Sequence, residues 1–111
     1  MTFRGYCTAV ALLVCCASLV GAQRGRKPAT HTVTIDAVSF KPATLTIKAG
    51  DSVEWVNKDI VSHTATADGA KGFESGALAA GKSWKRVFKA KGDLAYICRF
   101  HPTMKGRLVV Q

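Results

Sequence analysis

The chain has 111 residues, enough for one domain, and its 48% hydrophobic content is ordinary for a globular protein. Sixteen Lys and Arg against seven Asp and Glu give a formal net charge of +9, which favours acidic partners or anionic surfaces. Nucleic acid is disfavoured as the partner, because the basic residues are scattered and are not interleaved with aromatic residues as in single-strand binders.

The first 22 residues have the layout of a secretory signal peptide. Arg4 supplies the positive start, residues 7–20 form an apolar run, and small residues lead to a cleavage point after Ala22. An uncleaved membrane anchor is the alternative, but the apolar run is shorter than the ~20 residues that a spanning helix needs. We therefore expect an exported protein, and a bacterial periplasm fits best.

Cleavage after residue 22 would leave a single cysteine. Cys7, Cys15 and Cys16 lie in the signal peptide, whereas Cys98 stands alone in the rest of the chain. A lone cysteine in an exported domain cannot form an internal disulfide, so it is either a reactive thiol or a metal ligand.

Residues 23–31 are predicted to be a flexible basic segment ahead of the domain, which is expected to cover residues 32–111. The segment contains Arg24, Arg26 and Lys27. It ends at His31, which is expected to be a solvated surface residue and not a ligand.

The remainder of the chain alternates apolar and polar residues with a period of two, which is typical of β-strands, and contains no sustained helical stripe. Pro42 breaks the alternation, because proline cannot sit within a paired central strand. About seven short strands with glycine turns predict an all-β fold, an antiparallel sandwich or barrel. The expected strands cover residues 32–37, 44–48, 51–57, 61–66, 82–90, 94–98 and 105–111.

Some positions of this pattern are expected to face the core. Phe73 and Leu78 are the predicted anchors of a glycine-containing loop over residues 68–81. Tyr96 and Cys98 share one face of their strand, so the cysteine side chain is expected to point where the core residues point.

A candidate metal site follows from residues 98–104. Cys98, His101 and Met104 offer a thiolate, an imidazole and a thioether with two residues between each, a set that suits copper. A trigonal copper site needs a second histidine, and His63 is the candidate, because a two-sheet fold brings an upstream strand beside the penultimate one. Zinc is disfavoured because methionine is an unlikely zinc ligand. We therefore predict one copper ion on these four residues.

The sequence resembles the cupredoxins, which are small blue copper proteins, and most closely amicyanin and its plastocyanin-like relatives. The resemblance covers residues 32–111, and the two-residue gap between His101 and Met104 is similar to that of amicyanin. The stretches that carry it are FKPATL at 40–45, KAGDSVEWVN at 48–57, Ser62-His63 and YICRFHPTMKG at 96–106.

This resemblance implies a Greek-key antiparallel β-sandwich of about seven or eight strands with copper at one end. It also implies a one-electron carrier that cycles Cu(II)/Cu(I) and is not an enzyme. The implied partners are redox proteins, such as a c-type cytochrome or a dehydrogenase, with an acidic docking face for this basic, monomeric protein. The alternative function is copper storage, delivery or tolerance, although such proteins usually offer several methionines or paired cysteines.

Two residues depart from the family pattern. Thr64 follows His63 where many members carry an asparagine that ties the two ligand loops together, so a weaker tie is expected. Phe100 precedes His101 where amicyanins and plastocyanins carry proline. Unlike proline, Phe100 has a backbone N–H. We hypothesise that this N–H reaches the Cys98 sulfur and raises the reduction potential.

Overall fold

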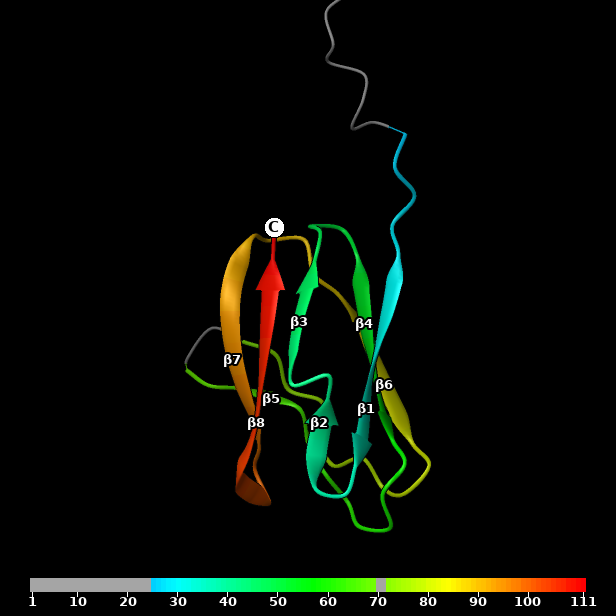
Figure 1. The fold of residues 1–111 in the computed structure, drawn as a ribbon, viewed down its shortest axis with the longest axis vertical. Helices are drawn as coiled ribbons and strands as arrows, with labels where there is room; N and C mark the ends of the chain where they lie inside the picture. The colour runs from blue at the N-terminus through cyan, green and yellow to red at the C-terminus, as the bar shows by residue number, and fades with distance from the viewer. Residues whose placement is uncertain (1–24, 70–71) are drawn as a thin grey trace, which may run out of the picture.

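The computed structural model describes residues 25–69 and 72–111, and over these ranges the chain forms eight strands and no helix (Figure 1). No helix in this part of the chain is therefore long and apolar enough to cross a membrane. The strands are β1 (Thr30–Asp36), β2 (Ser39–Lys41), β3 (Thr44–Ile47), β4 (Ser52–Asn57), β5 (Thr66–Ala67), β6 (Ser83–Val87), β7 (Gly92–Cys98) and β8 (His101–Val110). They build two four-stranded sheets, which confirms the predicted β-sandwich. The predicted signal peptide lies outside the described residues.

Both sheets are mixed, whereas the sequence predicted antiparallel pairing. The strand orders are β2-β1-β4-β6 and β3-β8-β7-β5. In the first sheet β1 runs parallel to β4, and in the second β3 runs parallel to β8. Parallel neighbours need a crossover connection, and here the chain leaves the first sheet to form β3 before it returns as β4. The remaining neighbours pair antiparallel, as expected.

The strand that follows the cysteine begins earlier than predicted. β8 starts at His101, four residues before the expected position, and pairs with β7 across a β-bulge at Ile97 and Cys98. The expected strand over residues 61–66 is replaced by the short β5 and an isolated bridge between His63 and Leu78. Figure 1 shows the β7–β8 hairpin, the loop after β4 and the β1–β2 turn at the same end of the sandwich.

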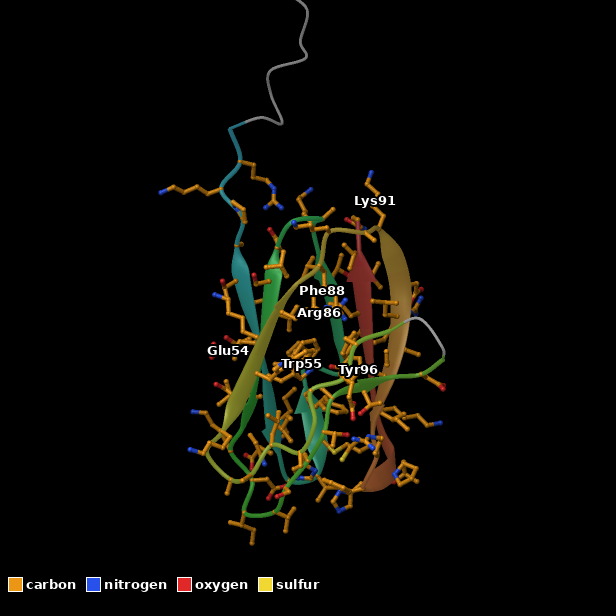
Figure 2. The ribbon with its side chains drawn as sticks, turned by 180° about the vertical axis from the view of Figure 1, so that it is seen from behind. Glu54, Trp55, Arg86, Phe88, Lys91 and Tyr96 are labelled. Atoms are coloured by element: carbon orange, nitrogen blue, oxygen red, sulfur yellow. The ribbon has the colours of Figure 1, made fainter. Side chains whose placement is uncertain are left out.

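The inner faces of the two sheets enclose an aromatic core. Trp55 on β4 is fully buried, stacks on Trp84 at 5.5 Å and meets the edge of Tyr96 at 5.6 Å between ring centroids (Figure 2). Burial of a side chain of this size stabilises the fold by roughly 3 kcal/mol. Phe73 and Leu78 are both buried, which confirms them as anchors of their loop.

A glycine fixes the position of the tyrosine ring in this core. Tyr96 lies opposite Gly106 in the β7–β8 ladder, and its ring covers the glycine. A Cβ at Gly106 would lie 2.1 Å from Tyr96 Cζ, which is far inside van der Waals contact. Glycine at this position therefore lets the ring lie flat, two residues before Cys98 on the same inner face of β7.

A buried carboxylate lies in the turn between β3 and β4, at the end of the sandwich opposite the β7–β8 turn. Asp51 is 1% exposed and accepts hydrogen bonds from Arg26 Nη2 at 2.7 Å, the Ala29 N–H at 3.0 Å and the Lys48 N–H at 3.2 Å. His31 Nε2 lies 2.9 Å from the second carboxylate oxygen. The His31 hydrogen bond is the largest of the causes that hold the pKa of Asp51 well below its usual range.

These contacts change two expectations about the segment before the domain. His31, expected to be a solvated surface residue, pairs with Asp51, and β1 already begins at Thr30. The described part of the segment is thus attached to the sandwich through Arg26 and Ala29.

Candidate metal centre

Three of the four predicted ligands come together where the β7–β8 hairpin meets the loop after β4. The ligand atoms of His63, Cys98 and His101 all lie within 4.8 Å of one another. The Nδ1 atom of each histidine lies 3.7 Å from Cys98 Sγ, and the imidazole centroids are 5.0 Å apart. Two ring nitrogens and one sulfur thus converge as the three in-plane donors of a trigonal copper site do.

Cys98 is placed by the last position of β7. The side chain is fully buried, as predicted, and Sγ accepts a hydrogen bond from the Thr64 N–H at 3.3 Å. Burial raises the pKa of the thiol, but hydrogen bonds led by that from the Thr64 N–H lower it to about 6. These bonds favour the thiolate, which is the form that binds metals.

His63 is held from both sides. Its backbone N–H donates to the Leu78 carbonyl at 3.1 Å, and the Leu78 N–H donates back at 2.7 Å, so the fully buried ring has a fixed base. Its Nε2 lies 2.9 Å from Asp59 Oδ2. Hydrogen bonds from the Val38 N–H, from His63 and from the Ile60 N–H lower the pKa of Asp59 to about 2. An ionised carboxylate only accepts, so Nε2 carries the proton and Nδ1 presents its lone pair to the site.

His101 and Met104 both lie on β8. His101 is the first residue of the strand and is partly exposed, so this imidazole is the candidate ligand closest to solvent. Met104 is 4% exposed and belongs to the inward-facing series of the strand. This position on the inner face of β8 fits Met104 as the predicted thioether ligand.

Thr64 ties the two ligand segments together. Its buried hydroxyl oxygen accepts the Arg99 N–H at 2.8 Å, while its own N–H reaches the Cys98 sulfur. The residue that follows one ligand is therefore bonded to the residue that follows the other. Threonine supplies this link at normal hydrogen-bond length, and the weaker tie expected from replacing asparagine stays a prediction.

Exposed apolar side chains lie at this end of the sandwich, in the segments that carry the candidate ligands and in the β1–β2 turn. Phe100, which precedes His101, is 53% exposed, and Ile60, in the loop before His63, is 91% exposed. Val38 and Val61 are also exposed at this end. We call these four side chains the apolar surface; of them, Phe100 is next to the partly exposed His101 in the chain.

Sequence reasoning overlooked Asp59, which orients His63. The available signal was a carboxylate four residues before the histidine in a loop. It also overlooked Glu74, which bonds to Thr66 and pairs with Arg99. Nothing in the sequence around Glu74 pointed to the ligand loop, because the contact depends on how the loop over 68–81 folds back.

Comparison with known proteins decides the family. A model of the cupredoxin-like domain matches residues 7–110 of the chain. The chain belongs to the cupredoxin family. Members of this family bind one copper ion, and the two imidazoles and the thiolate gathered here, with the thioether of the buried Met104, are donors that copper prefers.

The resemblance to amicyanin and plastocyanin is also confirmed. This cupredoxin is 34% identical over 89 residues to amicyanin-alpha of Methylorubrum extorquens, covering 76% of this chain and 75% of that protein. It is 37% identical over 87 residues to the chloroplastic plastocyanin of Tetradesmus obliquus, with coverage of 68% and 60%. Among solved structures, the purple cupredoxin from Nitrosopumilus maritimus superposes with a TM-score of 0.69 at 28% identity, covering 73% of this chain and 99% of that one.

The fold also occurs inside an enzyme. The copper-containing nitrite reductase from Thermus scotoductus superposes with a TM-score of 0.71 at 32% identity, covering 78% of this chain but 23% of the reductase. This cupredoxin thus corresponds to about a quarter of that protein.

Proposed function

We propose that this cupredoxin is a one-electron carrier that cycles a single copper ion between Cu(II) and Cu(I). His63, Cys98 and His101 would hold the copper ion, and Met104 would supply a fourth, weaker thioether ligand. The observation that carries the proposal is the convergence of both Nδ1 atoms on the Cys98 sulfur, each at 3.7 Å. Two imidazoles, one thiolate and one weak thioether are the ligand set of electron-transfer copper sites.

The chain contributes by holding these donors still. The bound copper supplies the redox couple, while the protein limits how far its ligands move when the charge changes. His63 is fixed by Asp59 and Leu78, and Cys98 is fixed by the Thr64 N–H. A donor set that is in place before and after electron transfer keeps the reorganisation small, so exchange is fast.

Electrons enter and leave through the apolar surface. His101 is the partly exposed imidazole, and the exposed ring of Phe100 lies next to it in the chain. A small apolar contact suits brief encounters, which bury less than ~1,200 Å². The partners are redox proteins such as a c-type cytochrome or a dehydrogenase, and the basic balance of the chain favours an acidic docking face on them.

The protein acts as an exported monomer, in the periplasm, and is not an enzyme. The signal-like residues 1–22 and the relatedness to amicyanin support export. The alternative, copper storage or delivery, is less favoured because residues 23–111 contain a single methionine and a single cysteine. A site with one thiol can hold one copper ion, and residues 23–111 offer no second thiol to which that ion could be transferred.

The test is an absorption and EPR spectrum of the copper-loaded protein, with Cys98→Ser as the control. We expect an intense thiolate-to-copper band that bleaches on reduction and returns on oxidation, and that is absent from the serine variant. A colourless protein that retains only Cu(I) would support storage. Failure of the band to appear in the wild type would refute the proposed carrier.

A further inference from the structure

Four residues form a closed hydrogen-bonded ring beside the proposed copper site. The Arg99 N–H donates to Thr64 Oγ1 at 2.8 Å, and the hydroxyl oxygens of Thr64 and Thr66 lie 2.9 Å apart. The Thr66 hydroxyl donates to the Glu74 carboxylate, and the other carboxylate oxygen pairs with the Arg99 guanidinium. The ring starts and ends on the residue that follows Cys98.

The charge on Glu74 fixes the direction of every bond in this ring. An ionised carboxylate can only accept, so the Thr66 hydroxyl must donate to it. The lone pairs of Thr66 are then free to accept the Thr64 hydroxyl proton, which leaves the Thr64 oxygen to accept the Arg99 N–H. The three hydrogen bonds from the Arg99 N–H through the two hydroxyls therefore all point toward Glu74, and bonds aligned in this way strengthen one another.

The loop that carries Glu74 is itself anchored to the segment with the threonines. Ser75 N–H donates to the Ala65 carbonyl at 3.0 Å, and the Ala65 N–H donates to Ser75 Oγ at 2.8 Å. The Ala67 N–H donates to the Phe73 carbonyl at 2.8 Å as a third connection, and together with the Ser75–Ala65 backbone bond it forms the bridge between Thr66 and Glu74. These contacts fix the position of the Glu74 backbone, although the Glu74 side chain is 41% exposed.

An ordinary surface ion pair would not give Glu74 a role, since exposed pairs contribute little on their own. The difference here is the pair of hydroxyls, which connects the carboxylate to the fully buried Thr64. The N–H of Thr64 is the donor to the Cys98 sulfur at 3.3 Å. Any movement of Thr64 relative to the 98–99 peptide therefore changes that donor.

We propose that Glu74 is a positioning residue for the thiolate. Through Thr66 and Thr64 it holds the Arg99 peptide, and so keeps the Cys98 sulfur against the Thr64 N–H. The inference rests on the proposed electron-carrier function and adds a determinant of its reduction potential. A hydrogen bond to the sulfur withdraws electron density and favours Cu(I), so breaking the ring lowers the potential.

The first arm of the test uses the metal-free protein. Amide hydrogen exchange of the Arg99 N–H is measured by NMR in Thr66→Val and Glu74→Ala. We expect exchange to accelerate by about tenfold in each, as for loss of one hydrogen bond to a charged acceptor. Thr66→Ser, which restores a hydroxyl, should return the wild-type rate. Glu54→Gln is the matched control, because Glu54 lies on β4 of the other sheet (Figure 2).

The second arm is voltammetry of the copper-loaded variants. Thr66→Val and Glu74→Ala should each lower the potential, and the double variant should lower it no further than the larger single effect, because both act through one ring. Glu74→Gln separates charge from hydrogen bonding, since its amide oxygen can still accept from Thr66; its potential should lie between those of wild type and Glu74→Ala.

The outcomes separate this inference from the proposed function. If the wild type shows no thiolate-to-copper band, the carrier proposal fails. The exchange rate of the Arg99 amide in the metal-free variants then tests the hydrogen-bonded ring by itself. If the band is present but both single variants keep the wild-type potential, Glu74 does not position the thiolate and the inference is overturned. Unchanged exchange of the Arg99 amide in Thr66→Val would overturn it as well.

Discussion

The Nε2 atom of His63 lies 2.9 Å from Oδ2 of Asp59, and this carboxylate oxygen also accepts the Val38 N–H at 2.9 Å. The turn between β1 and β2 is thereby linked to a candidate copper ligand in the segment that follows β4 in the chain. Histidine ligands of metals commonly donate their second nitrogen to a carboxylate, which sets both the tautomer and the ring orientation.

Replacing Asp59 with alanine is expected to weaken copper binding. Without the carboxylate, the proton on Nε2 of His63 is no longer held and the ring can rotate or change tautomer. Loss of such a partner lowers metal affinity by about 10–100-fold. Competition with a chelator of known affinity measures this effect, and Asp68→Ala, an exposed carboxylate in a loop, is the control. Equal loss in both variants would contradict a specific role for Asp59.

Phe100→Pro is expected to lower the reduction potential. The Phe100 N–H is the weakest of the groups that lower the pKa of the Cys98 thiol, and proline removes it. One donor fewer leaves more electron density on the sulfur, which favours Cu(II). Voltammetry measures the shift, and Phe100→Ala, which keeps the N–H and removes the ring, should stay nearer the wild type. No drop in the proline variant would count against the hypothesis.

Asp51→Asn is expected to remove an acid-sensitive part of the stability. Contacts led by His31 and the Ala29 N–H hold the pKa of Asp51 well below its ordinary value of 3.8. Because the pKa of Asp51 is lower in the folded state than in the unfolded state, the ionised carboxylate stabilises the fold above about pH 4. This contribution disappears as the pH falls towards the folded-state pKa.

Thermal unfolding at pH 7 and at a series of lower pH values tests this expectation. At pH 7 the asparagine variant should melt below the wild type. The gap should narrow below pH 4, because the wild type then loses the ionised partner of Arg26 and His31. A gap of constant size across the series would show that the charge of Asp51 does not matter.

Gly106→Ala is expected to destabilise the fold by about 1–3 kcal/mol, as overpacking of a tight core does. The new methyl group would lie 2.1 Å from Tyr96 Cζ, so the ring or the β7–β8 ladder must shift. Gly92→Ala is the matched control at the start of β7, because nothing lies within 4 Å of its added Cβ. Urea denaturation compares the two, and equal stability would argue against the close approach of the ring.

Much of the fold was predictable because the chain alternates strictly where one face of a strand is buried. This pattern placed Tyr96 and Cys98 on an inner face, and both are buried. The proximity of His63 to the hairpin ligands could also be predicted from the sequence, because a two-sheet fold leaves few segments that can lie beside the end of β7. The identity of the donors then narrowed the metal to copper.

The β1–β2 hairpin was not predictable, because its turn lacks the residues that such turns favour. Ala37 and Val38 have φ values of 49° and 54°, the left-handed region that two-residue hairpins normally fill with asparagine or glycine. One local and one tertiary hydrogen bond compensate: the neighbouring Asp36 accepts the Ala37 N–H, and the distant Asp59 accepts the Val38 N–H. The sequence around the turn does not show the contact with Asp59.

The parallel pairs and the Glu74 ring were equally hidden. Both depend on which distant segments become neighbours, and alternation along one strand carries no information about that. Asp51 is similar: a turn residue by sequence, it becomes the buried acceptor for Arg26 and His31 only after β1 docks beside β4.

The chain enters the sandwich at the end opposite the candidate copper ligands (Figure 1). Arg26 and Ala29 bind Asp51 there, so residues 26–29 have a defined position relative to the domain. A surface-immobilised form attached through residue 25 would therefore present His101 and Phe100 outward, away from the support. The proposed docking face thus lies at the end of the sandwich away from the point where the described chain begins.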